Sequence, residues 1–192
     1  MHNAMIELIQ KSLSPSRGFS EVIVLPIQSI ASKNINKLQK SDQLVCAESE
    51  DSRMLVESKR VDIIVNAELY EQKDSLHQRR AGINEVICKL AKKNCVAIGF
   101  NFSLLLHTEG KQRARLLGRM QQNAMLARKY KVPVVISCFA SKIEEQRSSY
   151  ELAQFGIVLG FTPQEAKEAV GNVANILAEK KGRIKPGLKV IS

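Results

Sequence analysis

Five short runs of aliphatic residues alternate with longer amphipathic segments along this chain. The runs are rich in Val and Ile, and most are nearly continuous in hydrophobicity, as expected of strands buried on both faces. They lie at residues 21–27, 43–48, 61–67, 95–102 and 132–137. Strands that alternate with helices predict an α/β fold with a parallel sheet, either a closed barrel or an open doubly wound sheet.

The amphipathic segments between the runs are predicted to be helices. They span residues 4–13, 79–94, 110–131, 148–160 and 162–182. Ser148 is a predicted N-cap with Glu151 in the first turn, and Thr162 precedes a proline at a first helical position. Gly182 follows a basic pair, which is typical of a helix end.

The chain has 192 residues, enough for one domain with a substantial core. We find no linker long enough to divide it, so a single domain is predicted over residues 1–182, followed by a tail at 183–192. No window approaches about 18 apolar residues, and no secretory h-region is recognisable. The four cysteines form no CxxC pair, which is typical of reduced thiols in an intracellular protein.

Positive charge is concentrated in the middle of the chain. The formal net charge is +10. Residues 1–76 carry nine Lys/Arg against eleven Asp/Glu, residues 77–147 carry fourteen against four, and residues 148–192 carry six against four. A field of one sign attracts polyanions, although it says nothing about the fold.

Motifs for nucleotide, metal or nucleophile chemistry are missing from the sequence. There is no GxGxxG or GxxxxGK[ST], and Gly156 and Gly160 are interpreted as packing or helix-end residues. The three histidines have no HxH, HxxxH or HExxH spacing, so no metal site is predicted. No GxSxG is present, and Cys138 has no base beside it, so no catalytic residue is predicted.

Three carboxylates follow predicted strands, where a barrel enzyme would place its active site. They are Glu48, Glu50 and Glu68. A catalytic or metal-binding cluster is one interpretation. The other interpretation is that they are solvated rim residues or partners of arginines, and the sequence favours it because no histidine is positioned beside them.

The predicted helix at 110–131 carries seven basic residues and no acidic one after Gly110. Its apolar face is formed by Leu116, Leu117, Met120, Ala124 and Ala127. Arg115 and Arg119 are then expected on one flank and Arg128 on the other. Like charges four residues apart destabilise a helix by about 0.2–0.5 kcal/mol, which favours an anionic partner. A solvated basic face, or ion pairs with distant acids, is the alternative.

The same bias continues in neighbouring segments, at His77, Arg79, Arg80, Lys89, Lys92, Lys93, Lys111, Arg113 and Arg147. Together these residues favour binding to a polyanion. Phosphate contacts by Arg and Lys give strong, salt-dependent binding with little sequence information. Because aromatic residues are only 5% of the chain, recognition of folded RNA by backbone and shape is more plausible than single-strand stacking.

Three long blocks resemble one known family. HQRRAGINEVICKLAKKNCVAIGFNFSLLL, RARLLGRMQQNAMLARKYKVPVVISCFAS and EEQRSSYELAQFGIVLGFTPQEAKEAV are similar to the barrel protein subunit of archaeal-type ribonuclease P, protein component 3. The resemblance runs from about Val61 to the C-terminus. It implies a TIM-like (β/α) barrel with parallel strands that assists a catalytic RNA in removing the 5′ leader of precursor tRNA, without being the catalyst itself.

The resemblance also implies partners and site residues. The expected partners are the catalytic RNA, precursor tRNA indirectly, and a small RRM-like subunit in a two-plus-two assembly. The protein is expected to bind no cofactor, whereas the RNA-based holoenzyme is expected to need Mg²⁺, in the cytoplasm. The RNA-binding candidates are Arg79, Arg80, Lys111, Arg113, Arg115, Arg119, Arg128 and Arg147, with His77 as a possible contact.

The sequence departs from the family pattern in two places. Family members begin with a strand, whereas MHNAMIELIQ reads as helical almost at once, so the first barrel strand is expected to be truncated. Where the family has Arg-Ser-Pro, this chain has Arg147-Ser148-Ser149, which keeps the helix cap but loses the proline. Two other functions remain open, a stand-alone barrel metallophosphoesterase and a purely protein-binding scaffold.

Overall fold

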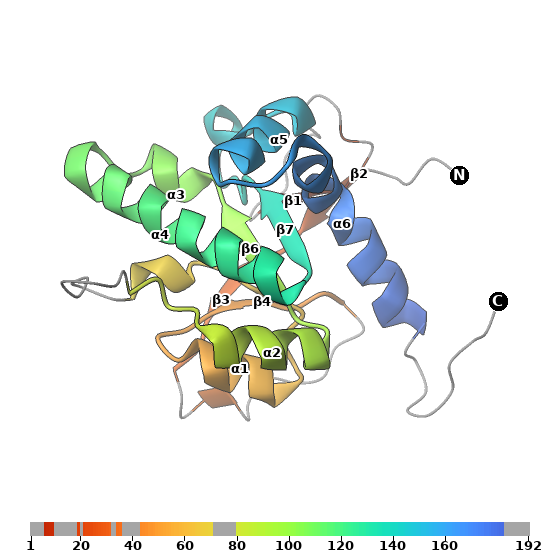
Figure 1. The fold of residues 1–192 in the computed structure, drawn as a ribbon. Coiled ribbons are helices and arrows are strands. Elements are labelled where there is room, and N and C mark those ends of the chain that lie inside the picture. The colour runs from red at the N-terminus through yellow and green to blue at the C-terminus, as the bar shows by residue number, and fades with distance from the viewer. Residues whose placement is uncertain are drawn as a thin grey trace.

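The computed structural model describes residues 6–9, 19, 21–31, 34–35, 43–70 and 80–182. Within these residues every paired strand is parallel to its neighbour (Figure 1). The strands are β1 (Ile6–Ile9), β2 (Glu21–Val24), β3 (Ile27–Ser29), β4 (Cys46–Glu48), β5 (Ile63–Ile64), β6 (Ala97–Asn101) and β7 (Val134–Ser137). The predicted parallel sheet is therefore confirmed, and strands alternate with helices from β4 onward.

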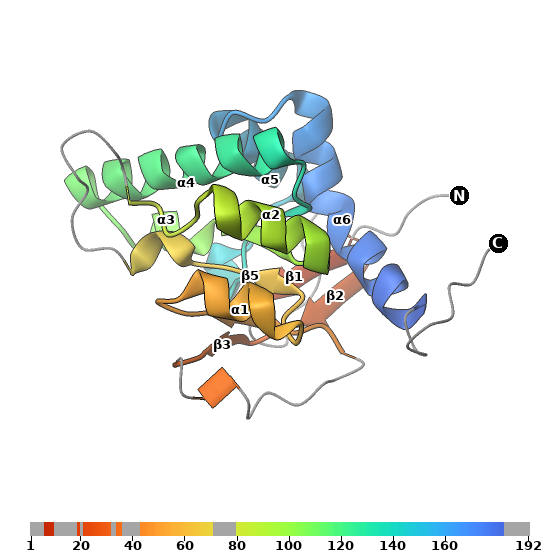
Figure 2. The ribbon, with the colours of Figure 1, turned by 60° about the horizontal axis from the view of Figure 1, so that its bottom comes forward.

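From β4 onward, helices connect successive strands and cover the outside of the sheet. They are α1 (Ser52–Ser58), α2 (Glu85–Asn94), α3 (Ser103–Leu106), α4 (Gly110–Tyr130), α5 (Ser149–Val158) and α6 (Pro163–Gly182), with short 3₁₀ turns η2 (Ala67–Leu69) and η3 (Ile143–Glu145). Figure 2 shows α1, α2 and α4 side by side, and α1 contacts α2 as α2 contacts α4. No helix in the described ranges is long and apolar enough to cross a bilayer.

The strands follow one another around a ring. β1 pairs with β2, and β3 begins a five-stranded sheet in the order β3-β4-β5-β6-β7. Only Leu25 and Pro26 separate β2 from β3. At the other end, the Leu8 N–H donates to Ser137 Oγ at 3.3 Å, and that hydroxyl donates to the Leu8 carbonyl at 3.1 Å. The arrangement is TIM-like, with β1 joined to β7 through a side chain.

The N-terminal segment corrects two expectations. The prediction of a helix over residues 4–13 is wrong for Ile6–Ile9, which form a parallel strand against β2. The first strand was expected to be truncated, but it is present as β1, whose four residues equal the lengths of β2 and β7. Its central residue, Leu8, is fully buried between β2 and β7. The tail at 183–192 lies outside the described residues.

Alternate residues along the strands enter two separate apolar clusters. Ile64, Ile98 and Ile136 pack with the helices. Ile63 and Val135 belong to a second cluster inside the ring, which also receives Leu8 from β1. This two-faced burial explains why the strand sequences are almost continuously hydrophobic.

Helix α6 closes the N-terminal ends of the strands. It contacts both β1 and β7, and its Val173 joins the inner cluster. Near its end, Lys180 Nζ donates to the Gln43 carbonyl and to the Asp62 carboxylate. Because Gln43 and Asp62 precede β4 and β5, this helix covers the face opposite the strand exits.

The helix caps predicted for α5 and α6, and the packing role predicted for Gly156, are confirmed. Ser148 caps α5 and forms a reciprocal capping box with Glu151. Thr162 caps α6 in the same way, since its hydroxyl accepts from the Glu165 N–H while the Glu165 carboxylate accepts from the Thr162 N–H. Gly156 serves close packing, because a Cβ there would lie 2.7 Å from the Ala166 Cβ.

Candidate nucleic-acid interface

The connections that follow β5, β6 and β7 carry most of the candidate residues. Because these strands are parallel, their C-terminal ends open at one edge of the ring. Figures 1 and 2 show η2, α3 and the first turn of α4 on this side. We call this surface the strand-exit edge, and define it as residues 66–69, 80–84, 102–115 and 139–148.

Three cations stand on the first two turns of α4. Lys111, Arg113 and Arg115 are exposed, and the first turn of the helix holds no acidic residue. Arg113 Nε donates to the Thr108 carbonyl at 2.6 Å, and no acidic partner is found within the described residues for any of the three. A helix N-terminus carries a partial positive charge, so a cation in the first turn, here Lys111 or Arg113, is unfavourable by about 0.3–1 kcal/mol, and the effect falls off before Arg115. An anionic ligand would offset this cost.

Other cations of the central segment have a structural reason for their positions. Lys92 and Lys93 end α2, and Arg128 and Lys129 end α4, where positive charge complements the helix dipole. Lys89 pairs with Glu85 one turn away. The positive charge that the fold itself leaves unexplained is therefore concentrated at the start of α4.

Arg147 is held in place just before α5. Its Nη1 donates to the carbonyls of Glu144 and Gln146 at 2.8 and 2.7 Å, and its guanidinium lies 5.5 Å from the centre of the Phe102 ring. Phe102 belongs to the connection after β6, so the two connections support each other. A guanidinium fixed in this way at the strand-exit edge is preorganised to donate hydrogen bonds to a phosphate.

Arg80 is exposed at the strand-exit edge, shortly before α2. Arg79 and His77 lie outside the described residues.

Arg119 does not share the exposed flank of Arg115, as the helical spacing had led us to expect. Only 4% of it is exposed, and its Nη1 donates to the Glu68 carbonyl at 2.9 Å. The connection after β5 packs over this flank of α4 and covers the side chain. In the folded chain Arg119 is therefore not accessible to a ligand at the surface, whereas Arg115 is.

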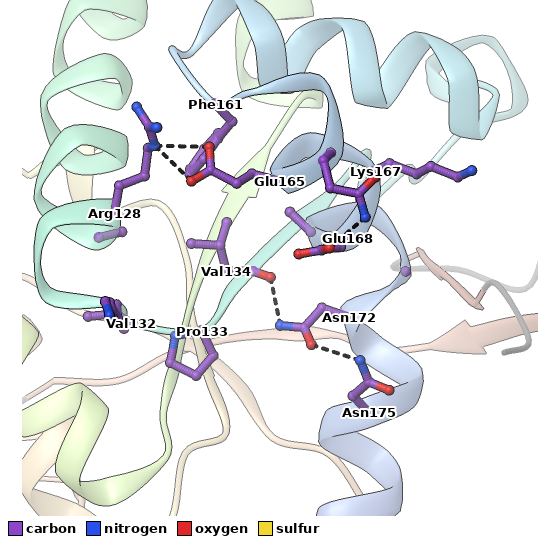
Figure 3. Close-up of a pocket in the computed structure, with 15 residues that line it drawn as sticks. Arg128, Val132, Pro133, Val134, Phe161, Glu165, Lys167, Glu168, Asn172 and Asn175 are labelled. Atoms are coloured by element: carbon purple, nitrogen blue, oxygen red, sulfur yellow. Dashed lines mark hydrogen bonds and ion pairs between the residues drawn. The ribbon is translucent and has the colours of Figure 1, made fainter.

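Arg128 lies near the other end of α4, roughly 25 Å along the helix from Lys111 at ~1.5 Å per residue. Its Nε pairs with the Glu165 carboxylate at 3.0 Å, and its Nη1 donates to the Gly160 carbonyl at 3.0 Å. Figure 3 shows this pair at one side of a cavity of about 750 Å³ between α4, β7 and α6. Arg128 is therefore separate from the strand-exit edge.

The three strand-end carboxylates occupy different environments. Glu50 is exposed, while Glu48 accepts hydrogen bonds from Ser29 and Asn66. Glu68 is 2% exposed and accepts from Asn123 Nδ2 at 2.8 Å. Burial raises the pKa of Glu68, against the lowering effect of its hydrogen bonds and of Arg119. The described residues include no group of three His, Cys, Asp or Glu side chains able to hold a metal ion.

Two groups of long-range contacts were not foreseen from the sequence. His107 Nε2 lies 3.0 Å from Glu145 Oε1, which links the connections after β6 and β7. Burial disfavours the charge of Glu145, but hydrogen bonds from Ser141 and His107 outweigh it and lower its pKa. Asn123, fully buried on α4, joins Glu68 to Ala81. Neither spacing nor composition indicates such long-range pairs.

The cysteines hold no disulfide among the described residues. All four are thiols, and Cys46, Cys88 and Cys138 are buried. Burial raises the pKa of Cys88 to about 11, so its thiol stays protonated at neutral pH.

Comparisons with known proteins point to one group. The family described as RNase P subunit p30 matches residues 26–185. "Ribonuclease P protein component 3" of Methanosarcina mazei is 33% identical over 144 residues, 73% of this chain and 57% of that protein. Its Methanosarcina barkeri counterpart is 32% identical over 97% of this chain and 71% of its own length. The chain thus spans little more than half of the first relative.

A solved structure has the same fold. A chain in the cryo-EM structure of archaeal ribonuclease P with mature tRNA superposes with a TM-score of 0.72 at 26% identity, covering 89% of this chain and 75% of that one.

Proposed function

Because the chain belongs to the RNase P subunit p30 family, we propose that it is an RNA-binding protein subunit of ribonuclease P. In this role it supports the catalytic RNA during endonucleolytic removal of the 5′ leader from precursor tRNA. The similarity to a chain of archaeal ribonuclease P solved with mature tRNA supports the assignment. The holoenzyme would act in the cytoplasm, as a soluble ribonucleoprotein.

The observation that carries the proposal is the group of three cations at the start of α4. Lys111, Arg113 and Arg115 are exposed and lack acidic partners within the described residues, and Lys111 and Arg113 stand in the first turn, where the helix dipole disfavours positive charge. Arg80 and Arg147 lie at the same edge. Phosphates of a folded RNA would neutralise all five, and each contact would release counterions.

The protein is proposed to contribute binding and no reacting group. Glu48 is engaged by Ser29 and Asn66, and Glu68 is buried and bound to Asn123. Both carboxylates are thus engaged by donors of the protein itself, which supports a binding role for this chain rather than acid–base chemistry. Mg²⁺ would then serve the RNA-based holoenzyme, and the chain itself would bind no cofactor.

A small RRM-like subunit, in a two-plus-two assembly, is the proposed protein partner. The family resemblance motivates it, and α5 offers a suitable surface. Tyr150 is 71% exposed and Val158 53% exposed on this helix. Exposed apolar side chains of this kind are commonly buried against protein partners.

Reconstitution tests the proposal directly. The purified chain would be combined with catalytic RNA and the RRM-like subunit, and leader cleavage measured at limiting Mg²⁺. Wild-type protein should raise the cleavage rate above that of RNA alone. A Lys111→Gln, Arg113→Gln, Arg115→Gln variant should assemble about a hundredfold more weakly, at ~1 kcal/mol for each lost contact.

The matched control removes three exposed cations elsewhere, as Lys59→Gln, Lys167→Gln and Lys181→Gln. It has the same net charge as the test variant and should assemble like wild type. No stimulation by wild-type protein, or equal losses in the two variants, would contradict the proposal.

A further inference from the structure

A single buried amide joins the two ends of the connection between β5 and α2. Asn123 lies on α4, and its Nδ2 donates to Glu68 Oε1 and to the Ala81 carbonyl, both at 2.8 Å. Glu68 belongs to η2, at the start of the connection, and Ala81 precedes α2, at its end. The amide is completely buried, so water does not compete for these bonds.

Arg119 strengthens the same junction from one turn earlier on α4. Its Nη1 donates to the backbone carbonyl of Glu68 at 2.9 Å, while Asn123 binds the side chain of that residue. A buried guanidinium carries a desolvation cost that an apolar side chain would avoid. We therefore attribute the buried position of Arg119 to its hydrogen bond with the Glu68 carbonyl rather than to a gain in stability alone.

The backbone at the junction is in direct contact. Gly82 has φ +79°, and a Cβ on it would lie 2.1 Å from the carbonyl oxygen of Ala67. Only glycine allows the two ends of the connection to meet this closely. Ala81, beside this contact, is adjacent in sequence to the exposed Arg80.

We propose that Arg119 and Asn123 are positioning residues, which clamp the base of the β5–α2 connection onto α4. The clamp fixes Arg80 relative to Lys111, Arg113 and Arg115, since those cations stand on the same helix. Arg119 thereby acts through Arg80, without touching RNA. This inference rests on the proposed function, because it concerns how the RNA-binding cations are arranged.

Preorganisation is the physical benefit of such a clamp. A cation whose backbone is already fixed loses less conformational entropy when it meets a phosphate. Loosening the base should therefore weaken RNA binding even though no charge is removed. Asn123 is neutral, so its substitution separates positioning from electrostatics.

The test measures binding to a transcript of ribonuclease P RNA at about 0.1 M salt. Asn123→Leu removes the two donated bonds at similar side-chain volume. It should weaken binding roughly tenfold, the loss expected when one charge-assisted contact is disabled. Arg80→Ala should weaken it equally, and the double variant should be no weaker than either single variant. Additive losses, roughly a hundredfold in the double variant, would overturn the clamp.

Gln121→Leu is the control, because it also replaces an amide by leucine, on an exposed flank of α4 where Gln121 donates to the Val158 carbonyl. It should leave RNA affinity unchanged. Hydrogen exchange gives a second measurement: amides at 67–69 and 81–84 should exchange faster in Asn123→Leu and not in Gln121→Leu. Equal exchange in all three proteins would contradict the proposal.

Arg119→Met keeps the test decisive where Asn123→Leu does not fold. In the Arg80→Ala background it should leave both affinity and salt slope unchanged, whereas a direct phosphate contact would lower the slope by about one ion. If the wild-type protein fails to bind the RNA, the proposed function itself is contradicted. If the wild-type protein binds the RNA, and Asn123→Leu has the same RNA affinity and the same hydrogen exchange as wild type, only the proposed clamp is contradicted.

Discussion

At the scale of single residues, Glu68 has an environment unlike that of any surface carboxyl. It is buried, and burial is the largest influence on its pKa, which is raised despite the hydrogen bond from Asn123 and the charge of Arg119. A carboxyl whose pKa is higher in the folded than in the unfolded protein stabilises the fold most below its unfolded pKa. That contribution is lost as the pH rises through the folded pKa.

Glu68→Gln should therefore become more favourable, relative to wild type, as the pH increases. The amide has the same shape, can still accept from Asn123, and cannot ionise. Thermal unfolding of both proteins, measured from pH 4 to pH 8, should show the difference in Tm moving in favour of the variant across this range. A difference in Tm that does not change with pH would show that burial does not raise the pKa of Glu68.

At the scale of elements, the packing of α5 against α6 and β7 depends on a small residue. A Cβ at Gly156 would lie 2.7 Å from the Ala166 Cβ and 2.8 Å from Ile136 Cδ1. By contrast, a Cβ at Gly171 on α6 would meet nothing within 4 Å. These two helical glycines separate the effect of packing from that of helix propensity.

Gly156→Ala should destabilise the protein by about 1–2 kcal/mol, because the cost of overpacking exceeds the gain in helix propensity. Gly171→Ala should stabilise it by roughly 0.4–1 kcal/mol, because only the propensity gain applies. Urea unfolding of the two variants and wild type measures both changes. Equal shifts in the same direction would contradict the packing described for Gly156.

The elements also show what the sequence can predict. Apolar periodicity located β6, β7 and the four later helices, because their burial follows from their own residues. The segment at Ile6–Ile9 was misassigned as helix, since its strand conformation depends on pairing with β2 and on Ser137, far along the chain. Helix α1, seven residues long, was not predicted.

The candidate site was predictable to a similar degree. Charge counting identified residues 77–147 and the helix at 110–131 as basic, and the structure places Lys111, Arg113 and Arg115 in exposed positions at the start of this helix. Helical spacing could not foresee that Arg119 would be covered, because the covering residue, Glu68, is distant in sequence. The positions of residues around a single helix contain no information about which other elements pack over its flanks.

At the scale of the whole molecule, the two ends of the ring differ. Helix α6 closes one end through Lys180, Gln43 and Asp62. At the strand-exit edge, the start of α4 presents Lys111, Arg113 and Arg115 without acidic partners among the described residues. The excess charge of residues 77–147 is not spread evenly over this edge, since Lys89 and Arg128 are paired elsewhere. Binding of a polyanion is therefore expected at the strand-exit edge.

The central claim is that the cations at the start of α4 contact phosphates of the catalytic RNA. The most direct test is the dependence of RNA affinity on salt concentration, plotted as log K against log [salt]. The Lys111→Gln, Arg113→Gln, Arg115→Gln variant should have a slope about 2–3 smaller in magnitude than wild type, at ~0.7–0.9 for each lost contact, while the Lys59, Lys167 and Lys181 control keeps the wild-type slope. An unchanged slope in the α4 variant, or the same decrease in the control, would contradict the account.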